Sequence, residues 1–205
     1  MNSKAVYPES RLERKKREVQ QKIINSALAL FQQQGIDATS MEQIAAAADI
    51  ARGTLYNYFP VKEAIISLYI EQVSSEKNAD RIASLEKLPD TRTRMTLSLQ
   101  EMMVWVNKQR DLFEKYFTYR VQNMVSLRRN EEQQKGLLSL ETAIIKLGQQ
   151  SGEIRTDIPF EILQALFEFA FIEVAQQFYK DSDHFDGEKT IADCVELFIN
   201  GTRRQ

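Results

Sequence analysis

The segment 51–58, ARGTLYNY, gathers side chains that can hydrogen-bond nucleic acid. Arg52 and Asn57 carry the guanidinium and amide groups that recognise guanine and adenine edges in the major groove. The hydroxyl groups of Tyr56 and Tyr58 can reach phosphate oxygens. Small residues that let a helix approach a sugar-phosphate backbone closely lie at the start of the segment: Ala51, Gly53 and Thr54. This combination favours a DNA-reading helix over one that is only buried.

A short helix must precede this segment to hold it in place. Two capping boxes overlap at its start, because Thr39 is followed three residues later by Glu42, and Ser40 by Gln43. Apolar residues then recur at helical spacing, at Met41, Ile44, Ala45 and Ala48. Asp49 suits a turn, since Asp tolerates the left-handed backbone. We therefore expect two short helices joined by a sharp turn, the second running from Ala51 to about Tyr58.

Longer helices are predicted on both sides of this pair. The first runs from about Arg11 to Gln34, and Gly35 ends it. Its apolar face consists of Val19, Ile23, Ala27, Leu30 and Phe31. Pro60 is well placed for the first turn of a fourth helix, which extends to about Lys77.

Basic residues concentrate beside the predicted DNA-reading unit, although the whole chain has a net charge of −2. Residues 1–22 hold seven Lys or Arg against three Asp or Glu. They include Arg11, Arg14, Lys15, Lys16 and Arg17. Positive charge at this place can neutralise phosphates. A charged tail that only aids solubility is the open alternative.

Together these motifs resemble the TetR/AcrR family of transcriptional regulators. The matching segments are ALALFQQQG (27–35), TSMEQIA (39–45), GTLYNYF (53–59) and the pair Lys62-Glu63. Their fixed separations make the match far more specific than a generic helix-turn-helix pattern. Beyond residue 80 the resemblance is one of size and helical style only. It implies a homodimeric repressor that binds a palindromic operator in double-stranded DNA and that is released from this operator by a small, largely apolar effector.

The resemblance also implies a role for each matching residue. Four residues lie against the major groove: Arg52, Gly53, Thr54 and Asn57. Four others mainly contact phosphates: Thr39, Tyr56, Tyr58 and Lys62. Ser40 belongs to the same DNA-binding surface. Arg52 and Asn57 are the best candidates for base recognition.

Three positions depart from the usual pattern of the family. Asp49 stands where glycine is common in the turn. Ala51 and Val61 stand where a polar residue often caps the next helix. Losing a cap typically costs about 1 kcal/mol, so the departures concern the stability of helix ends and leave the DNA-facing residues in place.

Composition excludes several other classes of protein. Cys194 is the only cysteine, which rules out an intramolecular disulfide and suits a reducing cytoplasm. His184, the only histidine, falls in a polar loop where a solvated side chain is the ordinary state. The polar N-terminus predicts no signal peptide, and no window is apolar enough for a membrane span. We expect no cofactor, no metal site and no enzymatic activity.

The rest of the chain is predicted to be helical, which makes the fold all-α. Further helices are expected at about 91–108, 111–127, 131–150, 159–180 and 187–203. No sustained β-type alternation occurs. The predicted domains are a DNA-binding domain with its basic arm at 1–60 and an effector-binding and dimerisation domain at 61–205.

The segment Phe160 to Phe178 is apolar nearly all round, and such a helix needs burial on more than one side. The second side can be another copy of the chain, so that this helix and the last one form a four-helix interface across a two-fold axis. Phe171 is expected to be buried in this interface. A purely intramolecular core is the alternative.

Aromatic and thioether side chains in the second half can line an adaptable apolar pocket. The candidate pocket residues are Met102, Trp105, Phe113, Tyr116, Phe117, Arg120, Phe167 and Phe171. A plain core remains an equal alternative for the aromatic stripe. Glu168, inside the apolar helix, can pair with Arg120, lie at the rim of a dimer or face a basic ligand.

Two other functions stay open from the sequence. An all-helical enzyme could use the pocket of the second half, although the chain has no glycine-rich phosphate loop or metal-ligand spacing. An architectural DNA-binding protein without an effector would bind DNA with strong salt dependence and little sequence preference.

Overall fold

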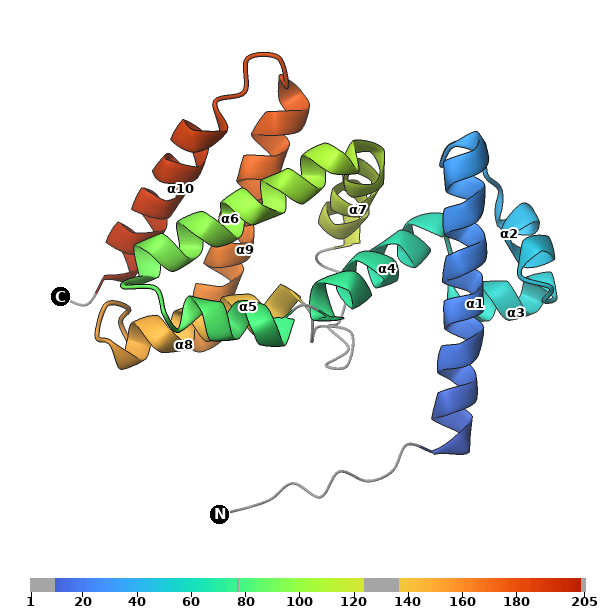
Figure 1. Cartoon of the computed structure of the whole chain (residues 1–205), viewed down its shortest axis with the longest axis horizontal. Coiled ribbons are helices and arrows are strands. Elements are labelled where there is room, and N and C mark those ends of the chain that lie inside the picture. The colour runs from blue at the N-terminus through green and yellow to red at the C-terminus, as the bar shows by residue number, and fades with distance from the viewer. Residues whose placement is uncertain (1–9, 77, 124–136, 204–205) are drawn as a thin grey trace. The chain divides into compact units, whose positions relative to one another are not determined.

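The computed structural model describes residues 10–76, 78–123 and 137–203. These residues form ten α-helices, and their one β-type feature is an isolated antiparallel bridge between Ile154 and Arg203 (Figure 1). The predicted all-α class is therefore confirmed. Within the described ranges, no helix is long and apolar enough to cross a membrane.

The chain divides into two compact units, one ending at Tyr69 and the other beginning at Ile70. The division falls inside helix α4 (Lys62–Glu76), whereas the sequence suggested a division before it, at 60/61. The first turns of α4 belong to the N-terminal unit, in which Lys62 bonds to the loop before α2.

The N-terminal unit contains α1 (Arg11–Gln34), α2 (Met41–Ala47), α3 (Arg52–Tyr58) and the start of α4. The observed bounds of α1 confirm the prediction. α1 packs against α2, and α2 packs against α3. The core of this unit includes Ile23, Ala27, Phe31, Ile44 and Leu55.

Two residues with positive φ shape the connections around α2. Gly35 has φ 86° directly after α1, and Asp49 has φ 47° between α2 and α3. A left-handed Asp49 was predicted from the sequence and is confirmed. The turn is closed by a 3.0 Å hydrogen bond from the N–H of Ile50 to the carbonyl oxygen of Ala45.

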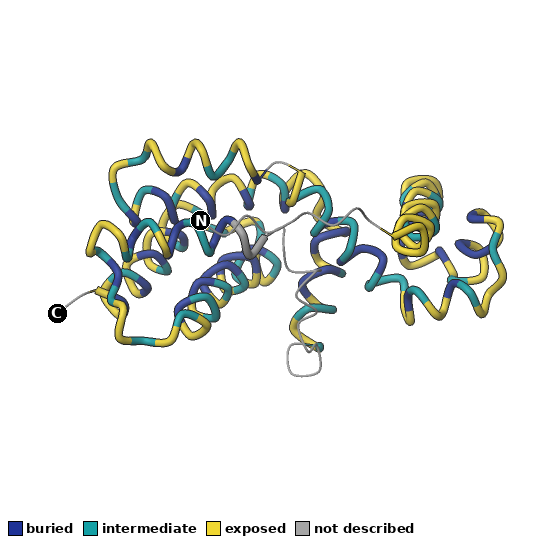
Figure 2. The backbone as a smooth tube through the Cα atoms, turned by 90° about the horizontal axis from the view of Figure 1, so that it is seen from below, coloured by how far each residue is buried: buried dark blue, intermediate teal, exposed yellow. Residues whose placement is uncertain are grey.

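The second unit continues with α5 (Asn78–Leu85), α6 (Thr91–Lys108), α7 (Arg110–Asn123), α8 (Leu137–Gln150), α9 (Phe160–Lys180) and α10 (Gly187–Thr202). α6 packs against α7, α8, α9 and α10, and α8 also packs against α5 and α9. The buried residues of α6, α9 and α10 recur along one side of each helix. Figure 2 shows buried and exposed residues alternating along the helical turns of the chain. α6 therefore lies at the centre of this unit.

The helices of the second unit differ from prediction in one respect. α5 was not predicted, because it follows α4 without an intervening proline or glycine. The observed bounds of α6, α9 and α10 agree with the predicted ranges to within a residue. The predicted end of a helix at 127 and start of another at 131 lie outside the described residues.

Candidate DNA-binding surface and effector cavity

The start of α2 is fixed by Ser40. Its hydroxyl accepts a 3.2 Å hydrogen bond from the N–H of Gln43, and the Gln43 side chain accepts a 2.8 Å bond from the N–H of Ser40. This reciprocal pair is the capping box, so the alternative start at Thr39 is not used. Ser40 remains exposed beside the helix that it caps.

Thr39 lies in the interior, not on the predicted DNA-binding surface. Only 2% of the residue is exposed. Its hydroxyl donates a 2.8 Å hydrogen bond to the carbonyl oxygen of Gly35 and accepts one from the Gln34 side chain. These bonds hold the end of α1 to the start of α2, and a phosphate contact of Thr39 stays a prediction.

The outer face of α3 carries most of the residues predicted to meet DNA. Leu55 is fully buried and Phe59 is nearly so, which anchors the helix from its inner side. The exposed residues are Arg52, Gly53, Tyr56 and Asn57, and the half-buried ones are Thr54 and Tyr58. Ala51 occupies the N-cap position and makes no side-chain capping bond, as its identity predicted.

Glu42 of α2 is a member of this surface that sequence reasoning did not single out. The guanidinium of Arg52 forms an ion pair with its carboxylate. The Tyr56 hydroxyl donates a long, 3.5 Å hydrogen bond to the same oxygen, Oε1. A hydrogen bond from its own main-chain N–H, together with the charge of Arg52, holds the pKa of Glu42 below its ordinary value. Glu42 thus connects α2 with two residues one turn apart on α3.

Lys62 is bound to main-chain oxygens of the loop between α1 and α2. Its ammonium donates hydrogen bonds to the carbonyl oxygens of Ile36 at 2.7 Å, Thr39 at 3.2 Å and Asp37 at 3.4 Å. An ammonium group has three N–H donors. In this conformation all three have protein acceptors, and a phosphate contact of Lys62 stays a prediction.

The first turns of α1 present the predicted basic residues at the surface. Arg11, Arg14, Lys15, Lys16 and Arg17 are all exposed. Arg14 lies 3.6 Å from Glu18, one turn further along the same helix. The basic segment is therefore helical and begins at the capping box of Ser10.

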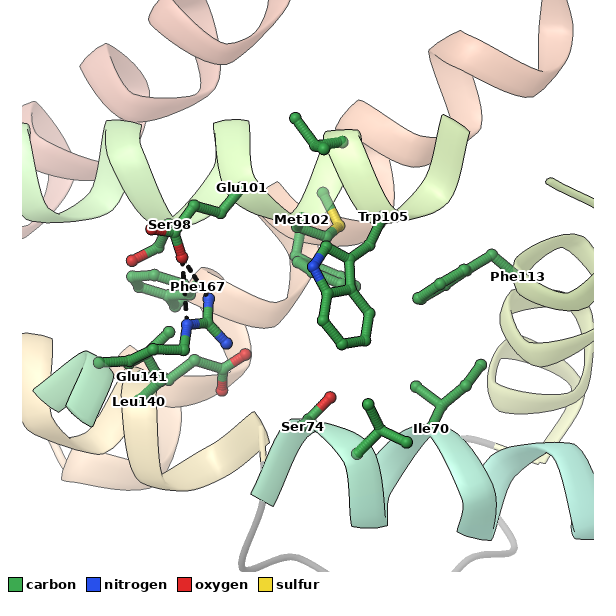
Figure 3. A pocket seen from close by; sticks show the side chains of 14 residues that line it. Ile70, Ser74, Ser98, Glu101, Met102, Trp105, Phe113, Leu140, Glu141 and Phe167 are labelled. Carbon is green, nitrogen blue, oxygen red and sulfur yellow. Dashed lines mark hydrogen bonds and ion pairs between the residues drawn. The ribbon is translucent and has the colours of Figure 1, made fainter. Parts of the chain in front are cut away.

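The second unit contains a cavity of about 320 Å³, which is within the size range of small-molecule sites. Residues from α4 to α9 line it. Five of them were predicted from the sequence: Met102, Trp105, Phe113, Phe167 and Phe171. The side chains of Trp105 and Phe113 point into the same space as Ile70 of α4 (Figure 3).

Three residues predicted for the pocket lie outside its wall. Tyr116 and Phe117 are buried in the helix packing, and burial raises the pKa of the Tyr116 hydroxyl. Arg120 pairs with Glu168 and lies 3.9 Å from Glu71. Pairing with Arg120 was one of the alternatives for Glu168, and it is confirmed. The guanidinium also lies over the Tyr116 ring, 5.9 Å from its centre.

Polar groups gather at one end of the cavity. Figure 3 shows the carboxylates of Glu101 and Glu141 there, while Phe113 and Ile70 lie at the opposite end. Arg81 of α5 belongs to the same end and bonds to Glu101. Sequence reasoning missed the wall residues from α4, α5 and α8, since no local pattern indicates which faces of these helices meet: Ile70, Val73, Ser74, Arg81, Leu140 and Glu141.

Part of α9 and α10 is apolar and exposed. Ile162, Leu166 and Phe169 recur on one face of α9, and Phe169 is 53% exposed. Leu197 of α10 is 76% exposed. Phe171, which was expected at an intermolecular interface, instead lines the cavity and packs on the Phe117 ring. The exposed apolar face of α9 is therefore that of Phe169.

The comparisons with known proteins agree with this architecture. Residues 23–68 match the family described as bacterial regulatory proteins, tetR family. The chain is 22% identical to the fatty acid metabolism regulator protein of Bacillus subtilis (strain 168), over 92% of this chain and 97% of that protein. It is 36% identical to the uncharacterized HTH-type transcriptional regulator YuxN of the same strain over 37% of this chain, and it spans only 25% of that relative's length.

A solved structure has the same fold. It is FadR of Thermus thermophilus, a TetR family transcriptional repressor in complex with lauroyl-CoA. The TM-score is 0.73 at 22% identity, with 91% of this chain and 96% of that chain covered. At this identity the likeness shows the fold.

Proposed function

We propose that this chain, which belongs to the tetR family of bacterial regulatory proteins, is a homodimeric repressor that an effector releases from a palindromic operator. The observation that carries the proposal is the outer face of α3, where Arg52 and Asn57 are exposed beside small and hydroxyl-bearing residues. A helix-turn-helix places such a face in the major groove.

The two best base-reading residues are Arg52 and Asn57, which offer bidentate groups for guanine and adenine. Gly53 and Thr54 allow the helix to approach the groove closely. Tyr56, Tyr58 and Ser40 supply hydroxyl groups for phosphate oxygens. Lys62 is proposed to act on DNA chiefly by holding the loop before α2, because its ammonium bonds to that loop.

The dimer is proposed to form through α9 and α10. Ile162, Leu166, Phe169 and Leu197 expose an apolar face on these two helices. A second copy related by a two-fold axis would bury this face in a four-helix interface. A two-fold dimer presents two reading helices to DNA, which is the reason for a palindromic operator.

The effector is proposed to occupy the cavity of the second unit. The cavity wall is largely apolar, and the similar FadR of Thermus thermophilus was solved with lauroyl-CoA. We therefore propose a long-chain acyl compound as the effector class. α4 would transmit its presence, since Ile70, Val73 and Ser74 line the cavity and Lys62 of the same helix holds the α1–α2 loop.

Selection of random double-stranded DNA against the purified protein tests the proposal. Sequencing of the bound fraction at near-physiological salt should show an enriched palindrome with two half-sites, and lauroyl-CoA should reduce binding to it. Enrichment of no sequence, with or without lauroyl-CoA, would contradict the proposed function. A DNA-binding regulator acts where the chromosome lies, so the proposed compartment is the cytoplasm.

A further inference from the structure

A second cavity of about 230 Å³ adjoins the first one within the second unit. Four residues line both cavities: Arg81, Ser98, Glu101 and Leu140. These residues therefore form a common wall. Two of them, Arg81 of α5 and Glu101 of α6, carry opposite charges.

The charged pair holds the wall together. Nε of Arg81 donates a 3.1 Å hydrogen bond to one carboxylate oxygen of Glu101, and Nη2 lies 3.0 Å from the same oxygen in an ion pair. The dashed lines in Figure 3 mark these contacts beside the Ser98 side chain. A guanidinium has five N–H donors, so this pair leaves donors of Arg81 for a further acceptor in either cavity.

The two partners depend on the pair unequally. The side chain of Arg81 is only 26% exposed, whereas that of Glu101 is 61% exposed. If the pair opens, Glu101 turns to solvent and loses little, because exposed ion pairs are weak. Arg81 would remain as a partly covered cation without a counter-charge, which is less favourable. A ligand group that takes the place of Glu101 on Arg81 must therefore be an anion.

Asp80 also lines the second cavity, but it is exposed, so its charge acts only weakly on a ligand there. Glu141 does not reverse this conclusion. Its carboxylate also lines the larger cavity, but the residue is only 7% exposed and already interacts within the protein. A cationic ligand would gain little at Glu101, which water already solvates.

We propose that Arg81 recognises the anionic group of an extended amphiphilic effector whose apolar tail fills the larger cavity beside Trp105. The anion takes the place of Glu101 on the guanidinium, and any part of the ligand beyond it enters the second cavity. This inference rests on the proposed effector-responsive function. The anion is a carboxylate or a phosphate, since both accept the parallel hydrogen bonds that a guanidinium offers.

Trp105 provides the measurement, because it is the only tryptophan of the chain and lines the larger cavity. Its fluorescence is titrated with three probes of equal chain length: dodecanoate, dodecan-1-ol and dodecyltrimethylammonium. Lauroyl-CoA is a fourth probe that places phosphates beyond the acyl group. The variants are Arg81→Gln and Glu101→Gln. Arg92→Gln is the control, because Arg92 forms an Arg–Glu pair with Glu196 but lines neither cavity.

The two variants should shift anion affinity in opposite directions. Arg81→Gln should weaken at least one of dodecanoate and lauroyl-CoA by about tenfold or more. Glu101→Gln should tighten the same probe by about two- to fivefold, because it removes the competing carboxylate. Dodecan-1-ol should change little in either variant, and Arg92→Gln should leave every probe unaffected. A loss for dodecanoate alone identifies a carboxylate, and a loss for lauroyl-CoA alone identifies a phosphate.

Other outcomes overturn the proposal. If Arg81→Gln lowered the affinity for dodecan-1-ol as much as the affinity for both anionic probes, Arg81 would contribute to packing and not to recognition of an anion. Tightest binding of dodecyltrimethylammonium, weakened by Glu101→Gln, would make the site one for cations. In both cases the cavity would still bind ligand and the proposed function would stand. If no probe changes Trp105 fluorescence or DNA binding in the unaltered protein, the effector-responsive function fails, and the role of Arg81 fails with it.

Discussion

The ammonium of Lys62, at the first residue of α4, lies 2.7 Å from the carbonyl oxygen of Ile36 in the loop that follows α1. This bond and its neighbours join the start of α4 to the loop that precedes the helix-turn-helix. The position of α2 therefore depends on a side chain that lies outside the two DNA-reading helices.

Replacing Lys62 with Met should destabilise the N-terminal unit. The change leaves main-chain carbonyls of Ile36 and Thr39 without their charged donor, which should lower the free energy of unfolding by about 1–3 kcal/mol. Urea denaturation measures the difference. Lys22→Met is the matched control, since Lys22 has a half-exposed contact with Asp49 at 3.7 Å and should change stability by less than about 0.5 kcal/mol. Equal stability of both variants would show that the loop does not need Lys62.

Glu42→Gln should lower the preference for operator DNA over random DNA. The amide keeps the size of the side chain but loses the charge that holds Arg52 in its observed direction. Asp49→Asn is the control, because it removes one negative charge from the neighbouring turn and leaves the Arg52 ion pair intact. Both variants should therefore bind random DNA with the same affinity. We expect the specificity ratio to fall about fivefold for Glu42→Gln only, measured by competition binding. The same ratio in both variants would mean that Glu42 contributes charge alone.

Asn57→Ala should cost about 1–3 kcal/mol of operator affinity while random-sequence binding stays nearly unchanged. The reason is that an amide that hydrogen-bonds to a base edge adds binding free energy only when the matching base pair is present, and random DNA seldom offers that base pair at the right place. Fluorescence anisotropy with both DNAs measures the two losses. Equal losses would contradict a base-reading role for this exposed residue.

A charge on the exposed face of α9 should separate the proposed dimer. Phe169→Glu places a carboxylate where the second copy would pack, so sedimentation should show monomers that keep their helical content. Val121→Glu, at a similarly exposed apolar residue of α7, is the control and should leave the dimer intact. A Phe169→Glu protein that sediments as a dimer would remove this face from the interface.

Gly148→Ala should destabilise the second unit although alanine favours helices. A Cβ atom at Gly148 would lie 2.5 Å from Oγ1 of Thr91 and 2.7 Å from Cδ1 of Ile154. Overpacking of this kind typically costs about 1–3 kcal/mol. Gly201→Ala, in α10, meets nothing within 4 Å and should be neutral or stabilising. The midpoint of thermal unfolding should therefore fall for Gly148→Ala and stay unchanged or rise for Gly201→Ala. An equal change in both variants would contradict the close approach at Gly148.

Local signals in the sequence were enough to predict several elements of the N-terminal unit. The bounds of α1 follow from a polar start, an apolar face and Gly35, and all of these act within a few residues. The turn at Asp49 follows from the tolerance of Asp for positive φ. Burial depends instead on partners that are distant in sequence. Threonine is usually found at the surface of a protein, yet the Thr39 side chain is buried and its hydroxyl donates a hydrogen bond to Gly35 at the end of α1.

The residues of the cavity wall also depend on partners that are distant in sequence, and fewer of them could be predicted. Its aromatic wall was partly predicted because Trp105 and Phe113 are conspicuous in the sequence. Arg81 was not, because α5 has no distinct boundary signal, and because its packing partner α8 and the Arg81 partner Glu101 of α6 are distant in sequence. When a helix is apolar on every side, the spacing of its apolar residues does not show which side is buried. The sequence therefore could not distinguish the exposed Phe169 from the interior Phe171.

The two compact units meet inside α4 and not in a loop, and this limits how the chain can be divided or recombined. A chimera that joins the DNA-reading part of one relative to the effector part of another at 69/70 would cut across consecutive helical turns. It would have to preserve the helical register of α4 across the junction, because the helix contributes Lys62 to one unit and Val73 to the other. Exchange of whole units between relatives is therefore expected to succeed only when α4 is inherited from a single parent.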